Sequence, residues 1–113
     1  MDCLFCRIIS GEIPAAIVYE NEHVIVIKDI NPAAPVHVLI IPKKHYKNII
    51  DAIKTDESVI VEIHRAVKES AELTGVDTDG FRLINNCGKY GGQSVDHLHY
   101  HLIGGINMGE RLI

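Results

Sequence analysis

The fold class is decided by the stretch His97-Leu98-His99-Tyr100-His101-Leu102-Ile103, in which histidine alternates with bulky, strand-favouring residues. Side chains in a β-strand alternate between two faces, so the three imidazoles are predicted to share one face, about 7 Å apart. The residues between them face the other way. Histidine is the side chain most readily tuned near neutral pH to act as nucleophile or proton carrier. This stretch therefore predicts a strand that carries a row of catalytic histidines.

Two other interpretations of the histidine row stay open at this point. A half-exposed strand can present histidine on its polar face without doing any chemistry. Three histidines can also ligate a catalytic zinc ion, because His-x-His on a strand is a common ligand spacing, provided that a metal-bound water completes the shell.

Other short apolar segments predict an antiparallel sheet around this strand. Including the histidine stretch, the predicted strands fall at residues 17–19, 24–28, 36–41, 81–86 and 97–103. Apolar residues at helical spacing from about Thr55 to Thr74 predict one long amphipathic helix, which Gly75 is placed to end. Residues 5–13 suit a short helix or turn. The predicted fold class is α+β, an antiparallel sheet of about five strands with one long helix and one or two short helices.

Composition predicts a single domain over residues 1–113. The chain has 113 residues, of which 47% are apolar, which is enough for one core and too little for two.

The net charge of −4 and the lack of any basic block longer than Lys43-Lys44 argue against binding to nucleic acid but are compatible with a small anionic ligand. The longest apolar runs are strand-sized and Met1–Cys3 shows no signal segment, so we expect a cytoplasmic protein without membrane attachment.

Three cysteines, with Cys3 and Cys6 too close to brace a fold, argue against a disulfide framework. A Cys-x-x-Cys pair favours metal binding or redox chemistry, and free buried thiols are a further alternative. His23 and His64 suggest no role beyond that of surface or partly buried side chains.

The longer stretch Gly91-Gly92-Gln93-Ser94-Val95-Asp96-His97-Leu98-His99-Tyr100-His101-Leu102-Ile103-Gly104-Gly105 resembles the signature of the histidine triad family. Residues 5–14, 29–32 and 37–45 share the resemblance, which thus covers nearly the whole chain. It is greatest to the histidine triad nucleotide-binding branch, the purine nucleoside phosphoramidases. The third histidine, His101, is typically glutamine in the uridylyltransferase branch. The related diadenosine polyphosphate hydrolases usually differ in the loop before the triad.

The resemblance implies the HIT-like fold and hydrolysis of adenosine phosphoramidates through a nucleotidyl-histidine. His99 would be the nucleophile, and its Nε2 would attack the α-phosphorus. His101 and His37 would flank the phosphate and donate hydrogen bonds to it, while Ser94 would help to protonate the amine leaving group. The other ring nitrogen of His99 needs an acceptor, for which a backbone carbonyl is suited. No catalytic cofactor is implied.

The resemblance also implies a purine nucleotide site. Asp29 would accept hydrogen bonds from both ribose hydroxyls, although without the resemblance the sequence favours a turn-forming or capping aspartate at this place. The purine pocket would be lined by apolar residues that otherwise suit a core: Phe5, Ile8, Ile13, Val18, Ile27 and Ile30. The positions near ribose and phosphate are Asn85, Gly92, Gln93, Ser94, His99 and His101. The amide side chains of Asn85 and Gln93 are also typical of a strand end or a loop without any ligand.

Cys3-Leu4-Phe5-Cys6 departs from family members that lack these cysteines and resembles bacterial-type members with a structural zinc. The implied ligands are Cys3, Cys6, His45 and His97. Two thiolates and two imidazoles fill a tetrahedral shell without a vacancy, so the zinc would stabilise the fold rather than activate water. Cys87 has no partner in this scheme and is expected to be a small buried residue.

Alternatives to the phosphoramidase remain at this stage. They are a nucleotide-binding regulatory or adaptor module whose hydrolysis is incidental, a dinucleoside polyphosphate hydrolase, and a zinc hydrolase that uses the triad as ligands. The family resemblance further implies a homodimer that joins the long helices and one edge strand of each subunit, which would also protect that edge.

Overall fold

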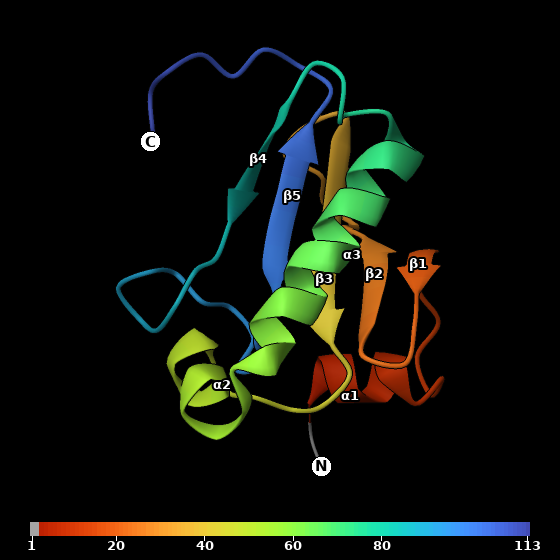
Figure 1. The fold of residues 1–113 in the computed structure, drawn as a ribbon, viewed down its shortest axis with the longest axis vertical. Helices are drawn as coiled ribbons and strands as arrows, with labels where there is room; N and C mark the ends of the chain where they lie inside the picture. Colours follow the sequence, from red (N-terminus) through yellow and green to blue (C-terminus); the bar gives the residue numbers. More distant parts are fainter. Residues whose placement is uncertain (1–2) are drawn as a thin grey trace.

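The computed structural model describes residues 3–113 and contains one five-stranded antiparallel sheet in the order β1-β2-β3-β5-β4 (Figure 1). The strands are β1 (Ile17–Glu20), β2 (Val24–Lys28), β3 (Val36–Pro42), β4 (Phe81–Ile84) and β5 (Tyr100–Gly104). The predicted α+β class with five antiparallel strands is confirmed. The expectation that no signal segment is present concerns in part Met1 and Asp2, which lie outside the described residues.

Three helices accompany the sheet: α1 (Leu4–Ile9), α2 (Ile49–Asp56) and α3 (Ser58–Thr74). In Figure 1, α3 lies across the face of the sheet that is turned toward the viewer. Gly75 ends α3 in the left-handed conformation, as predicted, with φ of 78°. Within residues 3–113, none of the helices has the length and apolar character that a bilayer crossing requires.

The two faces of the sheet belong to different cores, because β2 and β3 are buried on both sides. Val24, Val26 and Ile40 pack with the buried face of α3. Ile25, Ile27, Leu39 and Ile41 point the other way and pack with Cys3 and Phe5 around α1. The sheet is thus the middle layer between the long helix and the short N-terminal one.

The predicted long helix is wrong at its start. Thr55 and Asp56 belong to α2, a helix that was not predicted, and α3 begins only at Ser58. The side chain of Asn48 caps α2 by accepting a hydrogen bond from the Asp51 N–H at 2.9 Å, while the Asp51 carboxylate accepts from the Lys47 N–H at 2.8 Å. This reciprocal capping is readable in sequence and marks a helix that starts near residue 48.

Two predicted strands are shorter than expected. Regular sheet pairing of β5 begins at Tyr100, so the segment from His97 to His99 lies before the strand. In that segment the Leu98 N–H donates to the Tyr46 carbonyl at 2.7 Å. The strand predicted at residues 81–86 ends at Ile84, and the next side chain, that of Asn85, donates to the His99 carbonyl at 3.0 Å. At this end of the sheet, the hydrogen bonds from Leu98 to Tyr46 and from Asn85 to His99 therefore take the place of regular bonds between strands.

Ile63 is expected to be essential for the α3 side of the core, since its side chain is fully buried. Ile63→Ala should lower the free energy of unfolding by about 2–5 kcal/mol through lost burial and a residual cavity. Leu73→Ala on the same helix is the control, because that side chain is 61% exposed. Urea denaturation measures both losses, and equal values for the two variants would contradict the assigned packing.

Candidate functional site

Side chains of residues 97–103 alternate between two sides as predicted, although regular sheet pairing begins only at Tyr100. Leu98, Tyr100 and Leu102 are buried in the core under α3. The histidines between them lie on the opposite side, where the Phe5 ring contacts the His97 and His99 rings edge-on and the His99 and His101 ring centroids are 5.3 Å apart. The three imidazoles therefore line one side of the chain, each with its own neighbours.

His99 is held in one tautomer by its backbone. Its Nδ1 lies 2.8 Å from the carbonyl oxygen of His97. Because a carbonyl oxygen can only accept, the proton is on Nδ1 and the lone pair is on Nε2. Burial lowers the pKa of His99 below its ordinary value, which favours the neutral ring near pH 7. The expected backbone-carbonyl acceptor is thus confirmed and is that of His97.

His37 and His101 form a hydrogen-bond chain beside His99. The Ala33 N–H donates to Nδ1 of His37 at 2.9 Å, so the proton of His37 is on Nε2. That Nε2 lies 2.9 Å from Nδ1 of His101, to which it donates, and 3.4 Å from Oδ2 of Asp29. The chain leaves the proton of His101 on its Nε2, the nitrogen that has no part in it.

The groups around His101 shift its pKa in opposite directions. Burial is the main cause that lowers its pKa, and the nearby rings of His99 and His37 lower it further, whereas the carboxylate of Asp29 raises it. The ligand-type atoms of Asp29, His37 and His101 lie within 4.8 Å of one another. Since the Ala33 N–H keeps the proton of His37 on Nε2, these residues are arranged as a hydrogen-bond chain rather than as a metal shell.

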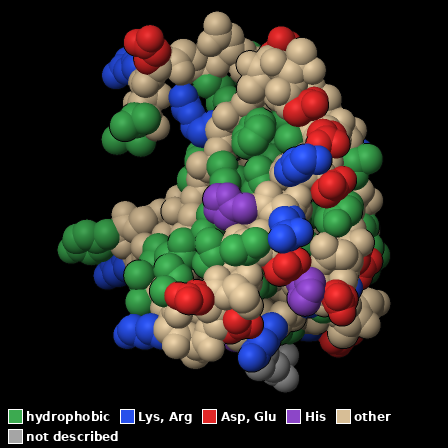
Figure 2. All heavy atoms as spheres, viewed as in Figure 1, with side chains coloured by type: hydrophobic (Ala, Val, Ile, Leu, Met, Phe, Trp, Pro, Cys, Tyr) green, Lys and Arg blue, Asp and Glu red, His purple; other side chains and the backbone are tan. Residues whose placement is uncertain are grey.

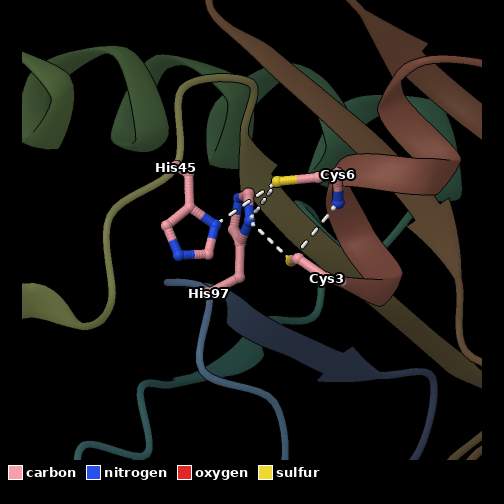
Figure 3. A group of neighbouring side chains, drawn as sticks. All are labelled: Cys3, Cys6, His45 and His97. Atoms are coloured by element: carbon pink, nitrogen blue, oxygen red, sulfur yellow. Dashed lines mark hydrogen bonds between the residues drawn. The ribbon is translucent and has the colours of Figure 1, made fainter. Parts of the chain in front are cut away.

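A second cluster joins α1 to the segments that follow β3 and precede β5 (Figure 3). The Nδ1 atom of His97 lies 3.4 Å from Sγ of Cys3 and 3.6 Å from Sγ of Cys6. Nδ1 of His45 lies 3.3 Å from Sγ of Cys6. All four ligand atoms lie within 4.8 Å of one another. The residues implied as zinc ligands are thus brought together.

The donor set and spacing of this cluster fit a tetrahedral metal ion. Zinc bonds to thiolate sulfur and imidazole nitrogen imply sulfur–nitrogen separations of about 3.6 Å in a tetrahedral shell. Nε2 of His97 donates to the Pro42 carbonyl at 2.8 Å, an arrangement typical of metal-binding histidine. Burial lowers the pKa of His97 to about 4, so the ring stays neutral near pH 7 and its Nδ1 lone pair faces the sulfur atoms.

The three triad rings do not converge on one point that could serve as a catalytic zinc site. His97 belongs to the cysteine cluster, while His101 belongs to the group with Asp29 and His37. Among residues 3–113, neither group of potential metal ligands contains all three triad histidines. The arrangement separates a candidate metal cluster from a candidate reactive ring at His99.

Comparisons with known proteins identify the family of this chain. The family model described as "Scavenger mRNA decapping enzyme C-term binding" matches residues 2–111. A HIT family hydrolase from Clostridium thermocellum has a structure similar to this one, with a TM-score of 0.96 and 52% identity, covering 99% of this chain and 97% of that one. The chain belongs to the histidine triad (HIT) family. The purine nucleoside phosphoramidase of Escherichia coli K12 is 39% identical over 111 residues, which are 98% of this chain and 93% of that protein. Protein HitA of Neisseria gonorrhoeae is 45% identical over 103 residues, covering 91% and 95% of the two chains.

The apolar residues assigned to the purine pocket of this HIT protein do not all lie together. Phe5, Ile8 and Ile27 share the core on the α1 side, with Phe5 against the His99 ring. Val18 packs instead against the core under α3. Ile13 is half-buried, and Ile30 is 92% exposed.

The polar candidates mostly support the backbone of the site. Oδ1 of Asp29 accepts from the Asn31 N–H at 2.8 Å, so this residue shapes its turn as well as facing His37. The side-chain amide of Gln93 bonds to the backbone of residues 47, 88 and 95 and thereby holds the loop before the triad. Gly92 and Ser94 in that loop are exposed. Cys87, which was predicted to be a small buried residue, is only half-buried.

A cleft of about 630 Å³ opens beside His37 and His101. Its other walls come from β4, Asn85 and Asn86, and the C-terminal residues Leu112 and Ile113. Figure 2 shows the molecule hollowed between the C-terminal segment and the loop that follows β4. No motif in the sequence points to these C-terminal residues. The backbone groups of Ala33 and Pro42 that fix the histidine tautomers were not predicted either, because main-chain donors and acceptors have no sequence signal.

The electrostatic link between Asp29 and His101 can be tested directly. Asp29→Asn should lower the pKa of His101, because the carboxylate that favours the protonated ring is lost. An NMR pH titration of the His101 ring measures this change, with Asp77→Asn in the loop between α3 and β4 as the control. An unchanged or higher pKa in Asp29→Asn would contradict the described contacts.

Proposed function

We propose that this HIT protein hydrolyses the phosphorus–nitrogen bond of adenosine 5′-monophosphoramidates and related nucleotidyl bonds, through a covalent nucleotidyl-histidine on His99. The observation that carries the proposal is the hydrogen bond from Nδ1 of His99 to the His97 carbonyl, which leaves the Nε2 lone pair available. The names of the Escherichia coli relative, a purine nucleoside phosphoramidase, and of the structurally similar HIT family hydrolase support the reaction class.

The proposed reaction has two displacements. Nε2 of His99 forms a bond to the α-phosphorus while the bond to the leaving nitrogen breaks, and the departing amine takes up a proton with the help of the Ser94 hydroxyl. Water then attacks the same phosphorus and gives up a proton to solvent, the bond to Nε2 breaks, and the nucleoside monophosphate leaves while His99 returns to its neutral form. Two moderate barriers replace one high barrier.

His101 is proposed to donate its Nε2–H to a phosphate oxygen as negative charge shifts in the transition state. His37 acts through His101, because both nitrogens of His37 already have partners inside the protein. This assignment refines the role inferred from sequence, in which His37 donates to the phosphate itself. Asp29 would contribute twice, through His37 and by binding the ribose hydroxyls.

The nucleotide is proposed to lie between these polar groups and the apolar residues of the α1 side. Phe5, Ile8 and Ile27 are the best-supported purine contacts, since they adjoin the His99 ring on one side of the sheet. The remaining proposed contacts are Ile13, Val18, Ile30, Asn85, Gly92, Gln93 and Ser94. The cleft next to His101 is available to the leaving group.

Zinc is the metal proposed for Cys3, Cys6, His45 and His97, because two sulfur and two imidazole ligands suit its tetrahedral preference. When bound, the ion would cross-link α1 to the chain segments after β3 and before β5. Its shell would be filled by protein ligands, so it takes no part in the displacement at phosphorus.

His99→Ala is expected to reduce turnover of adenosine 5′-monophosphoramidate by at least about 10³-fold, because the nucleophile is lost. AMP affinity should largely persist, since the ribose and purine contacts remain. Turnover is followed by chromatography of released AMP, and AMP binding by calorimetry. His23→Ala, in the turn between β1 and β2, is the matched histidine control.

The outcomes separate the proposal from its competitors. Unimpaired turnover in His99→Ala would refute the covalent mechanism. Very slow turnover of every phosphoramidate by the unmodified protein, together with tight AMP binding, would favour a regulatory or adaptor module. Faster cleavage of diadenosine polyphosphates than of phosphoramidates would favour the dinucleoside polyphosphate hydrolase.

We also propose a homodimer that joins the long helices and the edge strand β4. Support comes from exposed apolar side chains on β4, where Phe81 is 39% exposed, and on α2, which packs against the long helix and leaves Ile50 53% and Ile53 47% exposed. The position of β4 at the edge of the sheet is a further support. Light scattering at micromolar concentration should give twice the 12.5 kDa mass of the chain. The mass of a monomer would contradict the proposal.

A further inference from the structure

His97 connects the metal cluster to the reactive ring. Its imidazole, with its Nδ1 toward Cys3 and Cys6, is part of the cluster shown in Figure 3. Its backbone carbonyl accepts the hydrogen bond from Nδ1 of His99 at 2.8 Å. The residue is fully buried, so ring and carbonyl are both enclosed by protein. One residue therefore contacts a proposed metal ion with its side chain and the proposed nucleophile with its backbone.

The sheet does not fix the carbonyl of His97, because the regular pairing of β5 begins at Tyr100. The backbone next to it is anchored by the Leu98 N–H, which donates to the Tyr46 carbonyl at 2.7 Å. Tyr46 directly follows His45, another member of the cluster. The direction of the His97 carbonyl thus depends on contacts made at and next to the cluster.

Phe5 provides a second connection between the two sites. It lies on α1 between the two cluster cysteines and is 4% exposed. Its ring centroid is 5.0 Å from that of His99 and 5.8 Å from that of His97, in edge-on contacts. Binding of both cysteine sulfurs would hold α1, and with it the ring that packs against His99.

We propose that the metal-loaded cluster positions the nucleophile, so that Cys3, Cys6 and His97 are positioning residues for His99 as well as ligands. The proposal rests on the zinc and nucleophile roles given under the proposed function. Its consequence is that metal loss removes the bond at Nδ1 of His97 and leaves that ring held only by its hydrogen bond to the Pro42 carbonyl, while α1 loses its attachment to the cluster. The His99 ring then loses its fixed orientation and its single tautomer. Turnover should fall more than nucleotide affinity, because a misplaced reacting atom weakens the transition state first.

The test compares Cys6→Ser with Cys87→Ser in the full chain. Cys87 is the matched control because it is also a cysteine but is not a member of the cluster. Metal content is measured by mass spectrometry, and folding by circular dichroism. Histidine ring ¹⁵N NMR at constant pH reports the tautomer of His99, and kcat and AMP affinity are measured in parallel. The unmodified protein is treated in the same way, before and after chelation and again after zinc is restored.

The proposal predicts that the chelated protein and Cys6→Ser stay folded, lack metal and show mixed His99 tautomers. In these proteins kcat should fall about tenfold to a hundredfold, with AMP affinity less affected. Restored zinc should recover the NMR pattern and kcat of the unmodified chain, and Cys87→Ser should not differ from it.

An unchanged His99 tautomer in a folded, metal-free protein would overturn the proposal. Unfolding of both Cys6→Ser and the chelated protein would also overturn it, because the cluster would then act on the fold alone. The NMR result does not depend on turnover, so a chain without phosphoramidase activity would refute the proposed function and leave the positioning test intact.

Discussion

The proposed chemistry of this HIT protein depends on the hydrogen bond from Nδ1 of His99 to the carbonyl of His97. This bond decides which nitrogen of a buried imidazole carries the proton and which presents a lone pair. Burial lowers the pKa of His99, which favours the neutral ring near pH 7, and the same bond orients it. Without that acceptor, the same ring could rotate or exchange tautomers, and the neighbouring histidines would have no defined partner to assist.

The sheet register places the other groups around this bond. Leu39 on β3 pairs with His101 on β5, and His37 pairs with Ile103, so His37 and His101 are diagonal neighbours on one face. Diagonal side chains on an antiparallel pair are close enough for long or aromatic residues to meet. The His37–His101 hydrogen bond is thus a consequence of register, while α3 and its core support the opposite face of the same strands.

Periodicity predicted much of the fold and one face of the site. The alternation of residues 97–103 identified the side on which the histidines lie, because a two-residue period is a local property of extended chain. The start of β5 was not predictable in this way, since the partner of the Leu98 N–H is the carbonyl of Tyr46, distant in sequence.

Other parts of the fold and site were not predicted from the residues. The helix α2 was missed although Asn48 and Asp51 provide its cap. The four cluster ligands came from family resemblance, since a lone Cys-x-x-Cys does not identify two distant histidines. Val18 packs on the α3 side, next to a register irregularity in β1 that a simple alternation does not anticipate.

The central claim is a transient covalent bond between Nε2 of His99 and phosphorus. Its most direct test is to mix the protein with an adenosine phosphoramidate, to quench within one turnover in alkaline denaturant, and to map the modified peptide by mass spectrometry. The covalent mechanism predicts an adenylyl group on His99 that forms and decays at rates compatible with turnover. A complete reaction without any adenylylated peptide, or with the adenylyl group on another residue, would contradict it.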